Sequence, residues 1–384
     1  GMTKEELENN LGTIAKSGLS LLGGAIAGVT AGMTAAIGAS GAVGSEFEAQ
    51  MSRVQAISGA TSEEFAALRD QAIQLGADTA FSASSAAMGM ENLAAAGFSV
   101  TEIMDAMPGM LDLAAASGED LAVSADIAAS ALRGFGLEAA DAGHVADVLA
   151  ANANMTNSSV ADTGEALKYI APLARAAGVS LEETAAAIGI MANAGIQGSQ
   201  AGTTLRGALS RLSRPTDEMV GIMDKLGLSF YDSEGRMLSL TDQVRMLETA
   251  LEGATDEERN NYLVTLYGQE ALSGMLALIN EGPDSLEELT KSFEECDGAA
   301  ASAAATMQDN LQGAVEQMKG SVETLGILIY DEMAEPLKGL AQEATEAVNG
   351  LTDAFKNGGF SGLIQAGASL AANVLTGIAQ EAPA

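Results

Sequence analysis

The chain has 384 residues, of which 47% are apolar but only 4% aromatic, so a sizeable core must be built largely from small side chains. Alanine is the strongest helix former, and β-branched and aromatic residues are scarce, which predicts an all-α fold. The 52 acidic and 18 basic residues give a formal charge of −34. This charge argues against direct nucleic-acid binding, which depends on Lys and Arg neutralising phosphates, and the single cysteine, Cys296, excludes an internal disulfide.

The N-terminal segment, residues 1–45, contains a stretch without charged residues from Ser17 to Ser45. Gly24, Gly28 and Gly32 recur every fourth residue and would form a smooth stripe on one face of a helix. Such a stripe fits a helix packed tightly against copies of itself in water. It also fits a segment that inserts conditionally into a membrane, and the sequence leaves both interpretations open.

Residues 46–215 are predicted to form a core of short helices arranged in hairpins. Capping boxes, in which a hydroxyl and a later carboxylate satisfy free amides at a helix start, are expected at Thr61/Glu64, Ser99/Glu102 and Ser180/Glu183. Helix ends are expected at glycines that can adopt a left-handed conformation, namely Gly76, Gly97, Gly118, Gly136, Gly178 and Gly195. Pro108 is placed at a helix start, where its missing N–H has no cost.

Two segments of this core resemble each other and suggest a weak internal duplication. Leu93–Glu102 and Leu173–Glu183 share a helix end, a glycine and the next helix cap, and a Ser-Ser pair precedes each. Repetition of this kind is typical of stacked helical hairpins. The alternative is that alanine-rich helices with good caps look alike without a common origin.

Residues 216–297 are predicted to be a helical subdomain with one small β-hairpin near 229–240, where two short runs flank a polar turn with glycine. Further capping boxes are expected at Thr255/Glu258 and Ser285/Glu288. Residues 298–357 are read as one long helix with a break near Pro336. The tail, residues 358–384, is again rich in Gly and Ala and mostly uncharged.

The long helix carries apolar residues that step alternately by four and three positions. This spacing predicts a short coiled-coil seam, which keeps one apolar edge toward a partner helix, formed by Leu311, Val315, Met318, Val322, Leu325 and Ile329. Because the pattern lasts only about three heptads, an ordinary packed helix remains the alternative.

The residues that most active sites need are scarce. The only histidine is His144, within a predicted helix, and it is read as a packing or surface residue. One cysteine and one histidine cannot build a familiar zinc site, and no phosphate-binding loop or nucleophile elbow is present. The sequence therefore predicts no enzyme, no cofactor and no metal site.

The chain resembles the core of the phage tail tape-measure family over roughly residues 45–345. The most specific match is the family's "GI-x-GS-x-AGT-x-LR" signature, present here as Gly195, Ile196, Gly198, Ser199, Ala201, Gly202, Thr203, Leu205 and Arg206. Other similar segments are Phe47–Val54, Leu75–Ser82, Leu93–Gly97, Leu132–Gly136 and Leu266–Ala271. In this resemblance Gly195 and Gly198 would turn the chain between two helices, Ser199 would cap the second, and Arg206 would lie exposed near carboxylates.

The resemblance implies a structural ruler in the lumen of the tail tube of a phage, prophage or tailocin-like device. Such a protein would set the length of the tube and then help the genome to cross the host envelope. The implied partners are the tail tube protein, tail assembly chaperones, tail tip or baseplate proteins, copies of the chain itself and the host membrane during infection. Assembly would take place in the host cytoplasm. The alternative is a membrane-active, pore-forming protein that acts through residues 17–45 and 357–380.

Overall fold

The computed structural model describes residues 42–331 together with 334, 346, 349–350, 352–354 and 356–357. The chain divides into two compact units, and the unit Glu46–Thr324 holds most of the described residues. Every regular element in the described part of the chain is a helix, which confirms the predicted all-α class. The glycine stripe at Gly24, Gly28 and Gly32 lies outside the described residues.

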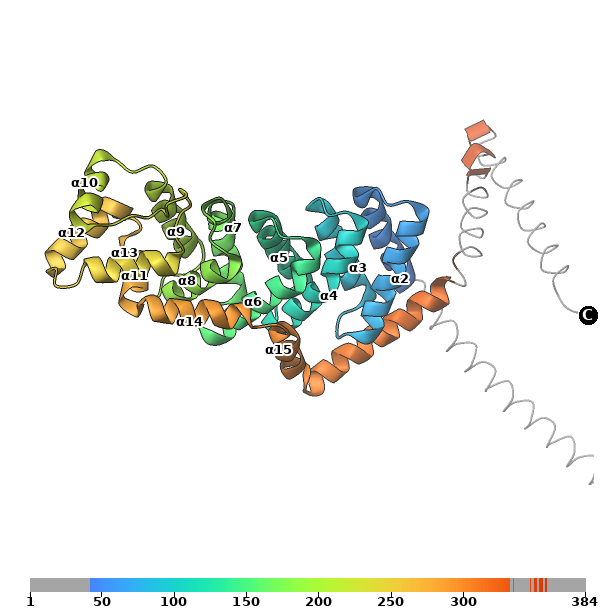
Figure 1. Cartoon of the computed structure of the whole chain (residues 1–384). Coiled ribbons are helices and arrows are strands. Elements are labelled where there is room, and N and C mark those ends of the chain that lie inside the picture. The colour runs from blue at the N-terminus through green and yellow to red at the C-terminus, as the bar shows by residue number, and fades with distance from the viewer. Residues whose placement is uncertain are drawn as a thin grey trace, which may run out of the picture. The chain divides into compact units, whose positions relative to one another are not determined.

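The helices of the unit Glu46–Thr324 are short and follow one another closely (Figure 1). Their bounds are α2 (Ser62–Asp78), α3 (Ala83–Ala95), α4 (Val100–Ser117), α5 (Leu121–Phe135), α6 (Ala142–Met155), α7 (Val160–Ala177), α8 (Leu181–Asn193), α9 (Gly198–Leu212), α10 (Asp217–Leu226), α11 (Leu240–Ala250), α12 (Asp256–Tyr267), α13 (Leu272–Glu281), α14 (Pro283–Glu294) and α15 (Ala299–Gln308). A 3₁₀ turn, Ala139–Asp141, precedes α6, and residues 42–58 and 311–331 are also helical.

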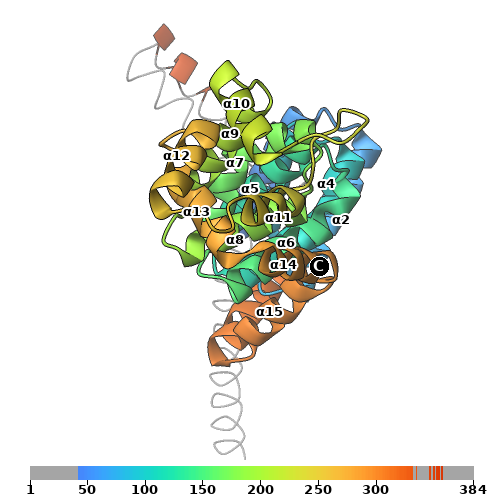
Figure 2. The ribbon, with the colours of Figure 1, turned by 60° about the vertical axis from the view of Figure 1, so that its left-hand side comes forward.

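Helices α3 to α9 form two stacked layers. In one layer α3 packs against α5, α5 against α7, and α7 against α9. In the other layer α4 packs against α6, and α6 against α8. Figure 2 shows α5, α7 and α9 on one side of α6 and α8. The two similar segments, Leu93–Glu102 and Leu173–Glu183, run from α3 to α4 and from α7 to α8, which are equivalent places in this stack.

The turns between layers follow from local cap chemistry. The capping boxes predicted at Thr61/Glu64, Ser99/Glu102 and Thr255/Glu258 are all present. Gly118, Gly136 and Gly178 adopt positive φ angles of 69°, 69° and 78° at the C-terminal ends of α4, α5 and α7. Because only glycine takes this conformation without strain, these positions turn the chain into the next helix.

Two predicted boundaries are wrong. Gly76 lies inside α2, and a Cβ atom there would lie only 2.5 Å from the backbone nitrogen of Ala83, so this glycine serves close packing instead of a helix end. Ser285 lies inside α14, which begins at Pro283. Proline at the first helical position loses no hydrogen bond, and it starts the helix two residues before the predicted cap.

Pro108 does not begin a helix but lies in the middle of α4. Proline cannot donate to the carbonyl four residues earlier, which here belongs to Met104. The side-chain amide of Gln71 on α2 donates to that carbonyl at 2.8 Å. A side chain from a neighbouring helix thus replaces the missing backbone donor, and α4 continues through the proline.

The β-hairpin predicted near 229–240 is not confirmed. The described residues form one isolated antiparallel bridge here, between Tyr231 and Met237, and no strand. The Asp232 carboxylate accepts hydrogen bonds from the backbone N–H groups of Glu234 and Arg236 and so organises the turn. Hydrogen bonds to the Asp232 side chain thus stabilise a tight turn, and the flanking residues do not pair as strands.

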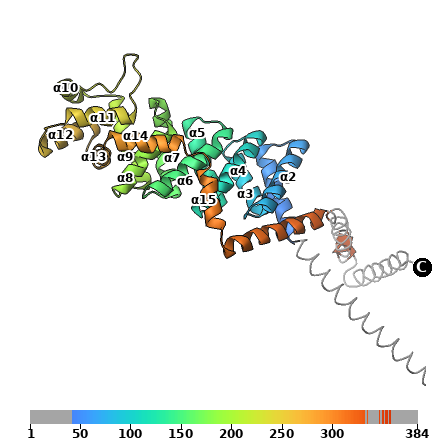
Figure 3. The same ribbon diagram turned by 60° about the horizontal axis from the view of Figure 1, so that its bottom comes forward.

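The C-terminal part of the unit, residues 283–324, runs back along the stack, and we refer to it as the strap. Its first helix, α14, packs against α8, α11 and α6, and α15 packs against α4 and α6 (Figure 3). The following helical residues reach α2 and α3, where the Glu323 carboxylate accepts a hydrogen bond from the Ser84 N–H at 3.0 Å. The strap therefore contacts helices along the whole stack, from α8 and α11 at the far end to the first hairpin.

The single helix predicted over 298–357 is wrong at its start. Helix α15 ends at Gln308, and the chain bends at Asp309 and Asn310 before it becomes helical again. The Asn310 side chain accepts from the Gly313 N–H at 3.0 Å and so caps the next helix. The predicted break near Pro336 lies outside the described residues.

Candidate functional site

The signature run begins where α8 ends and the chain turns toward α9. Gly195 has a φ of 83°, its N–H donates to the Ala192 carbonyl, and the Ile196 N–H donates to the Met191 carbonyl, both at 2.9 Å. This pair of bonds is the Schellman arrangement, which satisfies the last carbonyls of a helix. The geometry agrees with the turning role expected for Gly195.

The expected role of Ser199 as a helix cap is wrong. Helix α9 already begins at Gly198, which has a φ of 54°, and the cap residue is Gln197. The Gln197 side chain does not cap α9 but donates to the Asn157 carbonyl at 2.6 Å. The turn is therefore held by a neighbouring loop, which sequence spacing could not reveal, and Ser199 lies in the first turn of the helix.

The middle of the signature serves close helix packing. A Cβ atom at Gly202 would lie 2.3 Å from the Ala166 carbonyl oxygen, so only glycine lets α9 approach α7 this closely. Ala201 and Leu205 are fully buried on the same side of α9. Arg206 is exposed, and its guanidinium lies 5.6 Å from the centre of the Tyr169 ring on α7, a cation–π contact. The carboxylate neighbours expected for Arg206 stay a prediction.

The remaining signature residues face outward. Ile196, Ser199 and Thr203 line a shallow pocket of about 370 Å³ together with Glu270 and Ser273. Glu270 belongs to Leu266–Ala271, the later segment that also resembles the family, so the fold brings two similar segments together. Two backbone carbonyls at the end of α12, those of Thr265 and Leu266, accept hydrogen bonds from the Arg211 guanidinium at 2.9 and 3.2 Å.

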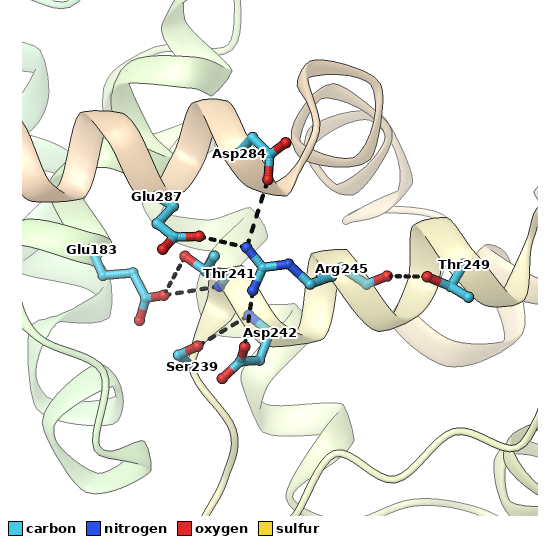
Figure 4. Close-up of polar contacts among 8 residues, drawn as sticks. All are labelled: Glu183, Ser239, Thr241, Asp242, Arg245, Thr249, Asp284 and Glu287. Atoms are coloured by element: carbon cyan, nitrogen blue, oxygen red, sulfur yellow. Dashed lines mark hydrogen bonds and ion pairs between the residues drawn. The ribbon is translucent and has the colours of Figure 1, made fainter.

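A polar junction joins α8, α11 and α14, and Figure 4 shows its side chains pointing toward one another. The Glu183 side chain is 7% exposed, and its carboxylate accepts hydrogen bonds from the N–H and the hydroxyl of Thr241, each at 2.9 Å. Arg245 forms ion pairs with Asp242 on its own helix and with Asp284 and Glu287 on α14. The predicted Ser180/Glu183 box is therefore only half formed: Ser180 caps α8, but Glu183 caps the start of α11.

His144 lies between two carboxylates, 2.8 Å from Glu182 on α8 and 3.2 Å from Asp297 before α15. Burial lowers the pKa of His144, but hydrogen bonds and charge from both carboxylates raise it more, so its pKa lies above the ordinary value. Beside it the Asp147 carboxylate accepts from the N–H groups of Gly298 and Ala300, each at 2.8 Å. The cluster fastens the strap to the stack, a role that spacing along the sequence did not reveal.

The thiol of Cys296 lies close to this cluster of carboxylates. Burial, followed by the nearby charge of Asp147, raises the pKa of Cys296 to about 11, so its thiol is not an activated nucleophile. Among the described residues no group of three or more His, Cys, Asp and Glu side chains could hold a metal ion.

The residues of the predicted coiled-coil seam are among the most exposed large apolar residues of the described part of the chain. Val315 is half-buried, and the other seam residues are exposed by 82% (Leu311), 59% (Met318), 62% (Val322), 58% (Leu325) and 37% (Ile329). The seam therefore does not contribute to the core of the described fold.

The comparisons with known proteins decide the family. The family model described as "Phage-related minor tail protein" matches residues 69–268. A protein named "Tape measure protein" from Pneumococcus phage Dp-1 is 58% identical over 323 residues, which is 82% of this chain. The chain belongs to the phage tail tape-measure family. A "Probable tape measure protein" of Escherichia phage P2 is 34% identical over 90% of this chain, and one of Clostridium phage phiCD119 is 23% identical over 86%.

This tape-measure chain spans only part of these relatives' lengths, namely 28%, 42% and 36%. No solved structure matches it. Its membership assigns it to a family of structural proteins of phage tails, and the comparisons do not support the alternative of a pore-forming protein. No helix of the described residues is both long and apolar enough to span a membrane. Most of segment 17–45 and nearly all of 357–380 lie outside those residues.

Proposed function

We propose that this tape-measure chain helps to set the length of the tail tube and that the protein later assists the genome across the host envelope. The similarity to a named tape measure protein over 82% of the chain carries the proposal. Gly195 turns the chain between α8 and α9, and Gly202 lets α9 pack closely on α7, which agrees with a structural role. The tail tube protein, assembly chaperones and tip proteins are the partners that this role requires.

The folded unit affects how length is measured. A continuous helix gains ~1.5 Å per residue, but the helices of Glu46–Thr324 lie side by side and the strap returns along them. We therefore infer that the unit is a compact folded block within the ruler and that it adds less length per residue than an extended helix. Residues outside the unit would supply the extended part.

Two in-frame deletions of equal size, made in the whole protein that the phage encodes, test this assignment. Removal of residues 332–357 should shorten the tail by about 40 Å if they belong to an extended helical template. Removal of residues 100–125, which takes away α4 and the start of α5, should prevent the stack from folding and abolish intact tails. Electron micrographs give both lengths. Infectious tails of unchanged length after the 332–357 deletion would contradict the proposal for that segment.

A further inference from the structure

The strap is bound unevenly along its length. Its first helix, α14, buries the side chains of Leu286 and Phe293 completely. In residues 298–324, which we refer to as the arm, the buried residues are all small: Ala300, Ala304, Gly320 and Thr324. Because burial of apolar area is the main source of docking free energy, the arm is bound to the stack much more weakly than α14.

Two further features weaken the docking of the arm. A cavity of about 890 Å³ lies between the arm and the helices α3 and α4, lined by Met307 and Gln312 on the arm and by Ser82 and Gly118 on the stack. The Thr324 hydroxyl is buried without a hydrogen-bond partner in the described part of the chain. An unpaired buried hydroxyl costs free energy, and here that cost applies only while the arm is docked.

Polar contacts anchor the arm at both ends. At the near end the buried Asp147 carboxylate accepts hydrogen bonds from the N–H groups of Gly298 and Ala300, each at 2.8 Å. At the far end Glu323 accepts from the Ser84 N–H at 3.0 Å. Gly298 has a φ of 83°, and glycine can leave such a conformation for many others at low cost. The arm is thus a helical segment that begins at a flexible residue and is held mainly by these anchors.

His144 supports the near anchor. It lies 3.2 Å from Asp297, directly before Gly298, and 2.8 Å from Glu182 on α8. A protonated imidazole donates from both nitrogens and a neutral one from only one, so loss of the proton leaves one carboxylate facing a lone pair. The other charged groups on the elements around it are Asp141 and Asp147 before and on α6, Asp112 on α4, and Lys291, Glu294 and Glu295 at the end of α14. Lys291 already pairs with Glu295 at 3.9 Å, so protonated His144 supplies the positive charge beside Asp297.

We propose that the arm opens as one piece about Gly298 while α14 and the stack stay folded, and that loss of the His144 proton favours this opening. Segments with few buried apolar contacts open locally at a lower free energy than the whole fold. The raised pKa of His144 agrees with a docked state that favours the protonated ring. Opening uncovers the face of α4 and α6 on which α15 lies. The device does not depend on the proposed role in tail length.

Hydrogen exchange of the full chain, followed by mass spectrometry, tests the hinge and its control by charge. After correction for intrinsic rates, arm amides should exchange at least about 10-fold faster than those of α14. Between about pH 6 and about pH 8 this ratio should rise at least about threefold in the parent and stay constant in His144→Gln. Equal exchange of the arm and α14, or a ratio that rises as much in His144→Gln as in the parent, would overturn the proposal.

A change at Asp147 tests the near anchor. Asp147→Asn keeps the shape of the side chain but removes the charge that accepts the two N–H groups, so exchange in α15 should accelerate at least about 10-fold while α8 and α14 stay unchanged. Asp126→Asn is the matched control, because the exposed Asp126 pairs with Lys168 away from the arm, and it should leave α15 unchanged. Equal effects of both changes, or acceleration of α8 and α14 together with α15, would overturn the hinged arm, whatever the tail-length deletions show.

Discussion

Glu183 offers the sharpest test of how the far end of the stack is held together. Its carboxylate is nearly fully buried and accepts two hydrogen bonds from Thr241, 58 positions later in the chain. A hydrogen bond to a charged group contributes about 1.5–3 kcal/mol, and the Thr241 N–H would be left without its acceptor in Glu183→Ala. We expect that variant to lose roughly 2–3 kcal/mol of unfolding free energy, after allowance for the desolvation of the carboxylate.

The conservative change separates charge from hydrogen bonding. Glu183→Gln keeps an oxygen that can accept from Thr241, so it should lose about 1 kcal/mol, the part due to charge and the helix dipole. Urea unfolding followed by circular dichroism gives all three free energies. Glu64→Ala is the matched control, because Glu64 belongs to an exposed local capping box and should cost clearly less.

A double-mutant cycle decides between a local and a long-range role for Glu183. If the carboxylate caps α11, Glu183→Ala and Thr241→Val should be coupled, because each removes the same hydroxyl hydrogen bond. If Glu183 acted only in a box with Ser180, the two losses would add independently. Additive losses, with Glu183→Ala no worse than the Glu64 control, would refute the reasoning.

Three further predictions concern other parts of the unit. Gly195→Val should destabilise by about 1–2 kcal/mol, because a left-handed φ of 83° strains any residue with a Cβ; an unchanged melting temperature would contradict the cap. Gln71→Leu should cost roughly 1–2 kcal/mol by leaving the Met104 carbonyl unpaired, and the cost should largely vanish in a Pro108→Ala background, as chemical unfolding would show. The pKa of His144 is raised in the folded state, so protonated His144 stabilises the fold. This stabilisation is fully present below the unfolded pKa near 6.5 and is lost as the pH rises through the folded pKa. As the pH rises through this range, the melting temperature of the parent should therefore fall relative to that of His144→Gln.

The sequence predicted those features that neighbouring residues determine. The box at Ser99/Glu102 and the left-handed glycine at Gly118 depend on groups within one turn of the chain, so their spacing is sufficient evidence. The all-α class followed for the same reason, since alanine favours helices locally. The two-layer stack was visible only as the repeated helix end and cap in Leu93–Glu102 and Leu173–Glu183.

The failures arise where a distant partner decides the outcome. Pro108 was placed at a helix start because proline usually breaks a helix, but the Gln71 side chain compensates for its missing donor. Glu183 matched a capping box by spacing, yet it caps α11 instead. The alanine-rich run after Gly298 was read as part of one long helix, but the chain bends at Asp309 and Asn310, where Asn310 caps the next helix and Glu323 docks that helix on α3.

The strap changes the physical character of the stack. A stack of hairpins in which each layer touches only its neighbours behaves as a nearly one-dimensional array, and its end layers can open alone. Here Asp147 holds the start of α15 on α6, and Glu323 holds the next helix on α3, so the strap joins helices from different hairpins of the stack. Because alanine side chains bury little apolar area, these few buried polar contacts carry more of the connection than they would in a leucine-rich core. The unit is therefore fastened at points along one strap, and without the strap the end hairpins of the stack should open more independently.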